Sequence, residues 1–291
     1  METLSSRPPA GLARRLVRDL RPTLHYLMET EVHVYAFSIA ANVLLSFFPF
    51  LIVIVTLCQR VFHWPTAADT ILIGLKDYFP DTVGEFIRYN VTVMVRDRGP
   101  FQAVSLILLL FTANGIFEPL EVALNRAWGV TKNRNYFHNQ LVSLGLIFTC
   151  GALALVSTTL TAVNRDFWTS SLPTGESLPL SINLLFFKLA ALPMVILVIF
   201  LVYWLLPNRK IAPMHVVPVA ICVGLVLEVL KYVNLITWPY LSKKLFHEVG
   251  PFFYSVSIVL WSTVAAMVVL AGAEWSARWA RESAREDGIP K

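Results

Sequence analysis

Residues 34–57 read VYAFSIAANVLLSFFPFLIVIVTL and contain no charged side chain. As a helix this stretch would be about 36 Å long, which exceeds the roughly 30 Å hydrocarbon core of a bilayer. In lipid the backbone must satisfy its hydrogen bonds within helices or closed barrels, and such long, uniformly apolar runs do not suit barrel strands. Similar runs follow at Phe101–Val122, Asn139–Ala162, Leu184–Leu206, Met214–Ile236 and Pro251–Trp275. We therefore predict an all-α polytopic membrane bundle of six transmembrane helices.

The composition agrees with a membrane protein. The 291 residues are 56% hydrophobic and 15% charged, whereas soluble domains carry about 25% charged residues. The first run is too long for a signal-peptide core and no small-residue cleavage site follows it, so we expect it to remain as a span. We predict a basic amphipathic cytoplasmic segment over residues 1–33, a transmembrane domain over 34–277 and a cytoplasmic tail over 278–291.

Lysine and arginine are distributed unevenly between the two sides of the predicted bundle. The N-terminal segment, the loops after the second and fourth runs and the tail carry more of them than the longer alternate segments do, for example Arg14, Arg15, Arg18, Arg126, Lys132, Arg209, Lys210 and Arg281. The positive-inside rule then places both termini in the cytoplasm, as an even number of spans requires. The basic N-terminal pattern also suits an anionic inner leaflet.

The first external stretch has a pattern of its own. Apolar residues recur at helical spacing after Pro80, at Val83, Phe86, Ile87, Val91, Met94 and Val95, and Asp81 suits the N-cap. A preceding helix is expected from about Thr66 to Phe79. We predict an external amphipathic helical hairpin over residues 66–97, which lies at the outer interface or caps the bundle; the alternative is a hairpin that only packs on the bundle ends.

The sequence offers little for catalysis. Its histidines are scattered, its three cysteines are isolated, and it has neither a Walker-type glycine loop nor a Gly-x-Ser-x-Gly elbow. We expect no catalytic residue, no metal site and no cofactor, and hence a protein that is not an enzyme.

Polar residues inside the apolar runs are the more informative group, because each is unfavourable in lipid. The second run ends with four polar residues at steps of 4, 3 and 4, namely Asn114, Glu118, Glu121 and Asn125. They share one helical face, with Pro119 inside it. This stripe is either an interfacial polar end neutralised by Arg126 or the lining of a cytoplasm-facing cavity.

The fifth run carries Glu228 and Lys231 at i and i+3, followed by Asn234, and the fourth run carries Lys188 at a similar depth. One interpretation is a structural pair of Glu228 with Lys231 or Lys188 that joins two helices. The other is a charged pocket for a headgroup, an ion or a proton. In both interpretations the glutamate faces protein rather than lipid.

Several short patterns resemble those of the YihY/BrkB family. They are Ala40–Phe50 with Ser46 and Pro49, Glu121-x-x-x-Asn125-x-x-Trp128, Tyr203-x-x-Leu206-Pro207-Asn208-Arg209, and Gly272-Ala273-Glu274. Their order and spacing match over roughly residues 24–277, but Asn42 stands where an aromatic is expected. The resemblance implies a multi-pass bacterial inner-membrane protein, often labelled ribonuclease BN.

The residues argue against that nuclease label. A metal-dependent nuclease needs clustered carboxylates or histidines beside the RNA, and the predicted cytoplasmic loops offer mainly lysine and arginine, which hold nucleic acid without specificity. We expect instead a transporter or lipid-handling protein, with membrane lipids as partners and an anionic headgroup or small solute as ligand. The alternative is a scaffold that binds envelope or membrane proteins through the hairpin. A homo-oligomer remains open in both cases.

Overall fold

The computed structural model describes residues 21–74, 82–96, 101–130, 135, 138–139, 141–153 and 180–286. Within these ranges the secondary structure is helical, without strands. The labelled helices are α2 (Thr30–Thr56), the π-helical turn η1 (Leu57–Val61), α3 (Pro65–Gly74), α4 (Thr82–Arg96), α5 (Phe101–Ala127), α7 (Leu180–Leu205), α8 (Pro213–Val249), the 3-10 turn η3 (Gly250–Phe252) and α9 (Phe253–Glu286). A further helix covers Leu141–Leu153.

Helices coincide with the apolar runs that the sequence shows. Thr30–Arg60, Pro213–Val249 and Phe253–Ser283 are long and apolar enough to cross a membrane, and Leu141–Leu153 and Leu192–Leu205 are shorter apolar helices. Helices α5 and α7, of 27 and 26 residues, cover the second and fourth runs. The prediction of an all-α membrane bundle is therefore confirmed. Residues 154–162 of the third run lie outside the described residues.

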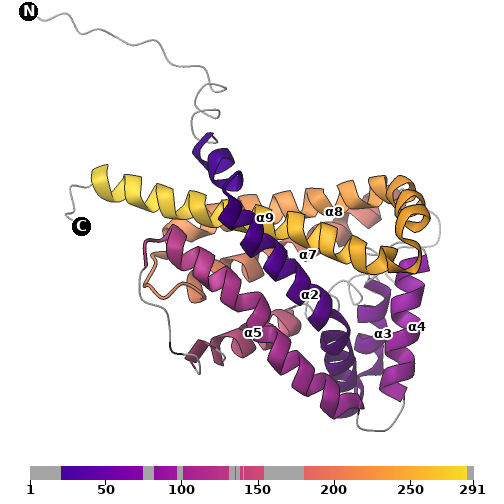
Figure 1. The fold of residues 1–291 in the computed structure, drawn as a ribbon. Coiled ribbons are helices and arrows are strands. Elements are labelled where there is room, and N and C mark those ends of the chain that lie inside the picture. Colours follow the sequence, from indigo (N-terminus) through magenta and orange to yellow (C-terminus); the bar gives the residue numbers. More distant parts are fainter. Residues whose placement is uncertain are drawn as a thin grey trace, which may run out of the picture.

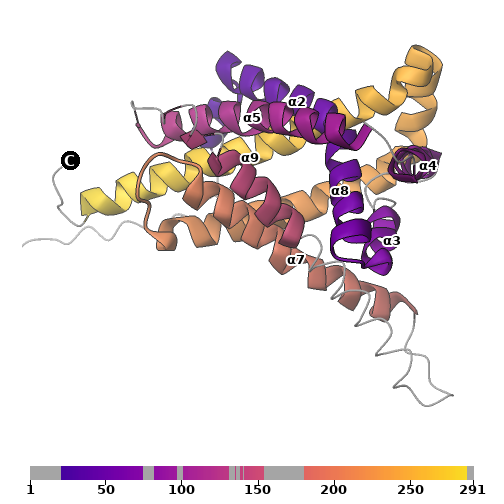
Figure 2. The ribbon, with the colours of Figure 1, turned by 90° about the horizontal axis from the view of Figure 1, so that it is seen from below.

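Helix α9 lies at the centre of the bundle. It packs against α2 and α5 on one side and against α8 on the other, and α8 in turn packs against α7 (Figure 2). Helix α2 crosses α9 diagonally, and α3 and α4 lie together at one end of the molecule (Figure 1). We call this the hairpin end. The opposite end, where α9 finishes, carries Arg126, Arg209, Arg278 and Arg281, and we call it the basic end.

Two apolar cores hold the helices together. The larger one runs along α2, α5, α7, α8 and α9 and includes the fully buried Leu124, Leu206, Val216 and Leu270. The smaller one lies at the hairpin end, where Ile87, Val91 and Val95 of α4 join side chains of α2, α3, α8 and α9 such as Leu51, Val55, Ala68, Trp238 and Phe253. Helices α3 and α4 therefore pack apolar side chains onto the bundle.

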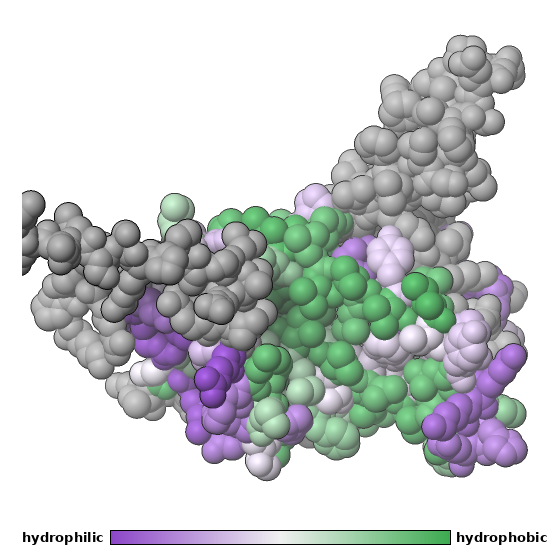
Figure 3. Space-filling view, turned by 90° about the horizontal axis from the view of Figure 1, so that it is seen from above, coloured by the Kyte–Doolittle hydropathy of each residue, from purple (hydrophilic) through white to green (hydrophobic). Residues whose placement is uncertain are grey.

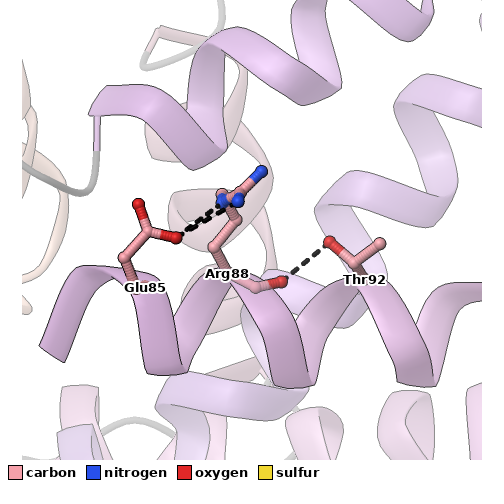
Figure 4. Close-up of polar contacts among 3 residues, drawn as sticks. All are labelled: Glu85, Arg88 and Thr92. Carbon is pink, nitrogen blue, oxygen red and sulfur yellow. Dashed lines mark hydrogen bonds and ion pairs between the residues drawn. The ribbon is translucent and has the colours of Figure 1, made fainter. Parts of the chain in front are cut away.

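The outward face of α4 carries charged and polar side chains. Arg88 donates to Glu85 at 3.1 Å, and the Thr92 hydroxyl donates to the Arg88 carbonyl at 2.7 Å (Figure 4). Both charged side chains are about half exposed. Such surface pairs contribute little stability. Burial of the apolar face therefore holds α4 in place. The predicted N-cap Asp81 lies outside the described residues.

Apolar and polar side chains are distributed over the surface as in a membrane protein. Figure 3 shows a hydrophobic band across the middle of the molecule, with hydrophilic residues gathered toward both ends. Large apolar side chains are exposed within this band, among them Val34, Phe37, Leu45, Ile107, Ile221, Leu225, Val229 and Val233. Lipid tails are the environment in which such a surface is favourable.

Two helices continue past the ends of their predicted spans. Helix α8 runs on from Ile236 to Val249, and Trp238, only 2% exposed in the hairpin-end core, anchors this extension. Helix α9 runs on past Trp275 to Glu286, with Ala277 buried and Arg281 bonded to the end of α5. Hydropathy marks where lipid ends. These helices continue because they still have packing partners.

Candidate functional site

Glu228 and Lys231 form a charge pair inside α8. The Lys231 Nζ lies 2.5 Å from Glu228 Oε1, and the two side chains are 10% and 16% exposed respectively. Glu228 Oε1 is itself buried, so the ion pair with Lys231 is formed away from solvent. Counting from Pro213 at 1.5 Å per residue, Glu228 lies about 22 Å along the helix. This depth is inside the apolar band rather than at its edge.

The pair lies on the protein-facing side of α8. Val229, Val233 and Ile236 are 60%, 42% and 72% exposed, whereas Asn234 is only 8% exposed. The predicted orientation of the acidic group toward protein therefore agrees with the burial. Lys231 also lies 5.4 Å from the centroid of the Tyr232 ring. Lys188 is on α7, but its side chain is outside the part of the chain that the structure describes.

A second buried polar group closes the basic end of α5. Glu121 and Asn125 are 3% and 1% exposed, and Asn125 Nδ2 donates to Glu121 Oε1 at 3.4 Å. The backbone amide of Asn208, in the loop between α7 and α8, donates to Asn125 Oδ1 at 2.8 Å. Asn125 thus joins the pattern that begins at Glu121 to the pattern that begins at Tyr203, although the two are far apart along the chain.

The predicted stripe on α5 divides between two environments. Glu118 is exposed while Glu121 and Asn125 are buried. The side chain of Asn114 is not among those described. Because steps of 3 and 4 residues spread over about 60° of helix surface, Glu118 falls at the edge of the face that the neighbouring helices cover. Arg126 pairs with Glu31 of α2, and both are exposed, so this arginine neutralises a carboxylate outside the stripe.

A third polar group joins the residues before α2 to α9. The Thr23 hydroxyl donates to Glu274 Oε2 at 3.0 Å, and Arg278 donates to the same hydroxyl at 3.1 Å. Tyr26 lies nearby, and burial, with the charges of Glu29 and Glu274, raises the pKa of its phenol to about 12. This network lies at the basic end, where Glu274 ends the Gly272-Ala273-Glu274 pattern.

The remaining pattern residues are structural in their surroundings. Ser46 is buried and its hydroxyl donates to the Asn42 carbonyl at 2.8 Å, one turn before the buried Pro49 of α2. Pro207 is buried in the loop after α7. Gly272 lets α9 approach its neighbours closely, since a Cβ there would lie 2.3 Å from Val223 Cγ2 and 2.5 Å from Tyr203 Oη.

The patterns therefore converge in space, at helix crossings and at the basic end. A family model described as Virulence factor BrkB matches residues 23–291. The chain belongs to the BrkB family. The resemblance seen in the sequence is confirmed, and BrkB membership together with the apolar helices makes this an integral membrane protein.

Three curated relatives are similar at low identity. A UPF0761 membrane protein of Chlorobium chlorochromatii is 24% identical over 251 residues, 86% of this chain and 56% of the relative. A UPF0761 membrane protein of Nitrosospira multiformis is 23% identical over 239 residues, which are 78% of this chain and 53% of the relative. A ribonuclease-like protein of Bacillus subtilis, YfkH, is 26% identical over 182 residues, which are 61% of this chain and 65% of the relative. The chain thus spans little more than half the length of the two UPF0761 relatives. No solved structure matches.

Sequence reasoning missed the arginines that close the end of α5. Arg281 of α9 donates to the Ala127 carbonyl at 2.9 Å, and Arg209 of the loop after α7 donates to the Trp128 carbonyl at 3.3 Å. In the sequence, Arg209 in a predicted loop and Arg281 in the predicted tail contribute only to the charge asymmetry that predicts the topology. No local signal reveals such contacts, because the partners are backbone oxygens more than 80 residues away. Among the described residues, no three metal-ligating side chains lie together.

Proposed function

We propose that this BrkB-family protein is a transporter or lipid-handling protein, and that the charge pair of Glu228 and Lys231 is its intramembrane site. The observation that carries the proposal is the low exposure of both charged side chains, 10% for Lys231 and 16% for Glu228, within the apolar span α8. A charged side chain inside a membrane helix is unfavourable by a few kcal/mol, and such residues usually mark a pathway for substrate, ion or proton.

A purely structural pair is the competing explanation. Buried ion pairs are seldom more stable than well-packed apolar residues of similar volume, because desolvation offsets their attraction. Stability alone therefore gives little reason to keep the pair. Pro218 and Pro239, which lie on either side of it in α8, add to the argument, since each removes a helical hydrogen bond and allows local bending. Interrupted helices around polar groups are characteristic of transporter binding sites.

The chemistry of the pair favours an anionic ligand. A phosphate or carboxylate group would compete with Glu228 for the Lys231 ammonium, which it would reach from the protein-facing side of α8. The buried Asn234, one turn further along, is the nearest additional polar group on this face of α8.

We place the protein in the bacterial inner membrane because it belongs to the BrkB family, and we place both termini in the cytoplasm on the lysine and arginine distribution. The basic end then faces the cytoplasm, and the pair lies in the outer half of the membrane. We assign no nuclease activity to it.

The test measures movement of two defined probes by purified protein in liposomes. Dithionite quenching follows fluorescently labelled phosphatidylglycerol across the bilayer, and a solid-supported membrane records currents driven by a phosphate gradient. We expect at least one probe to move faster than in protein-free vesicles. Lys231→Met should reduce that rate at least tenfold, because the ligand loses its cation.

Lys243→Gln is the matched control, since Lys243 lies on the same helix and is exposed. It removes the same charge and should leave the rate unchanged. The double variant Glu228→Gln/Lys231→Met tests the structural explanation. If it folds with wild-type stability and moves the probe at the wild-type rate, the pair is not the site. If wild type moves neither probe, the proposed transport of these anions is wrong.

The scaffold alternative retains one supporting observation. On the outward face of α4, Tyr89 and Val93 are 69% and 42% exposed beside the Glu85–Arg88 pair. If this surface binds another membrane or envelope protein, crosslinking from Tyr89 in living cells should capture one discrete partner, and Tyr89→Ser should abolish it. Capture of lipid alone, or of nothing, would exclude a scaffold that uses α4.

A further inference from the structure

Two arginines are fixed at the basic end by consecutive backbone oxygens. Arg281 Nη1 lies 2.9 Å from the Ala127 carbonyl, and Arg209 Nη1 lies 3.3 Å from the Trp128 carbonyl. Because neighbouring Cα atoms are about 3.8 Å apart, the two guanidinium groups are held within about 10 Å of each other. They come from α9 and from the loop after α7. The tertiary fold brings them together.

The contacts leave most of each guanidinium available. A guanidinium has five N–H donors in a planar fork, and the bond to the α5 carbonyl occupies one of them in each case. Both side chains are exposed, as is the adjacent Lys210. The bonds to these two carbonyls at the end of α5 therefore restrict the orientation of the two cations, whose side chains are exposed.

Three carboxylates of the described residues have partners of their own. Glu31 pairs with Arg126, Glu274 accepts from Thr23, and the Glu121 carboxylate accepts from Asn125. Glu282 follows Arg281 directly, but successive residues of a helix point about 100° apart. Arg209, Lys210 and Arg281 are thus exposed cations at this end whose charge the carboxylates of Glu31, Glu121 and Glu274 do not pair with in these contacts.

Aromatic and apolar groups mark the membrane boundary at the same end. Trp204 and Trp279 are 40% and 38% exposed, and Met214 at the start of α8 is 80% exposed. The Trp204 indole donates to the Ile211 carbonyl, and Trp279 packs edge-on against His215. Tryptophans of this kind concentrate at the level of lipid headgroups. Figure 3 shows hydrophilic residues gathering where this band ends.

We infer that Arg209 and Arg281 form a binding site for the phosphate group of an anionic phospholipid headgroup. The planar fork of arginine matches two phosphate oxygens at once, which gives geometric selectivity beyond simple charge attraction. Acyl chains of the bound lipid would lie along the exposed apolar surface that begins at Met214. This site is at the opposite end of the molecule from the hairpin and is independent of the Glu228–Lys231 proposal.

The test is native mass spectrometry of the purified full-length protein titrated with phosphatidylglycerol, with phosphatidylcholine as the zwitterionic comparison. Wild type should retain phosphatidylglycerol preferentially. Arg209→Gln/Arg281→Gln keeps an amide donor for the α5 carbonyls but removes both charges, and should weaken phosphatidylglycerol binding roughly 30-fold. The control Lys243→Gln/Lys244→Gln removes the same charge from exposed residues of α8 near the hairpin end and should leave binding unchanged.

A second variant separates headgroup geometry from net charge. Arg209→Lys/Arg281→Lys keeps both charges without the planar fork, and its affinity should fall between wild type and the glutamine variant. Inorganic phosphate distinguishes the two sources of the ligand, because a free-phosphate site would lose its lipid when phosphate is added, whereas a headgroup site would keep it. The inference is overturned if the glutamine variant, shown to be folded by its thermal unfolding, binds phosphatidylglycerol as wild type does. It is equally overturned if the Lys243→Gln/Lys244→Gln control loses as much phosphatidylglycerol affinity as the Arg209→Gln/Arg281→Gln variant.

Discussion

Replacement of Gly272 by alanine is expected to destabilise the bundle at the contact between α9, α7 and α8. The added Cβ would lie 2.3 Å from Val223 Cγ2 and 2.5 Å from Tyr203 Oη. Both distances are far below van der Waals contact. Tyr203 is 1% exposed, and its hydroxyl donates to the Val269 carbonyl at 2.5 Å, so it cannot move aside without losing that bond.

The magnitude follows from three opposing effects. Overfilling a packed site destabilises by about 1–3 kcal/mol, and loss of the tyrosine hydrogen bond adds about 1 kcal/mol. Alanine in place of glycine inside a helix offsets about 1 kcal/mol. We therefore expect Gly272→Ala to lower the free energy of unfolding by about 1–3 kcal/mol. The assay is unfolding in mild detergent, followed by tryptophan fluorescence.

Two further variants make the reasoning refutable. Gly145 lies in the helix Leu141–Leu153, and a Cβ there would meet nothing within 4 Å. Gly145→Ala should therefore stabilise the protein, by up to about 1 kcal/mol. Tyr203→Phe removes the hydroxyl, and in that background Gly272→Ala should be less destabilising by about 1 kcal/mol, a coupling that a double-mutant cycle measures. If both glycine variants shift stability in the same direction, or the cycle shows no coupling, the close approach at Gly272 is refuted.

Three other predictions concern stability and can be measured by the same unfolding assay. Gly115→Ala places a Cβ 2.0 Å from Asn42 Oδ1 and should destabilise the protein by about 1–2 kcal/mol. Adding Asn42→Ala removes that clash and should restore most of the lost stability. If stability does not recover, Asn42 is not the residue that the alanine side chain meets. Asn125→Ala removes the 2.8 Å hydrogen bond from the Asn208 amide and the 3.4 Å hydrogen bond to Glu121. The variant should lower the free energy of unfolding by about 2–3 kcal/mol. An effect below about 0.5 kcal/mol would mean that Asn125 does not join α5 to the loop after α7. Tyr26 has a pKa of about 12 in the folded protein, above the unfolded value of about 10, so its contribution to stability is complete below pH 10 and is lost between pH 10 and 12. Tyr26→Phe should therefore reduce the loss of stability between pH 10 and 12. If the pH dependence of stability is the same in this variant as in wild type, the raised pKa is contradicted.

The sequence by itself determined the class of structure. In lipid each backbone group must find its partner within the same segment, so an apolar run of sufficient length is a helix wherever it occurs. The amphipathic spacing of Ile87, Val91 and Val95 likewise determined which face of α4 is buried, because that periodicity depends only on helix geometry. The order of short polar and small-residue patterns was enough to indicate the BrkB family.

Only the tertiary structure decided which residues meet. The stripe on α5 looked uniform in sequence, yet Glu118 is exposed and Glu121 is buried, because coverage by neighbouring helices ends between them. Hydropathy ended α9 near Trp275, but buried Ala277 and bonded Arg281 continue the helix to Glu286. Arg209 and Arg281 meet at the end of α5 because a folded chain brings distant segments together, and the spacing of residues along the chain carries no record of such contacts.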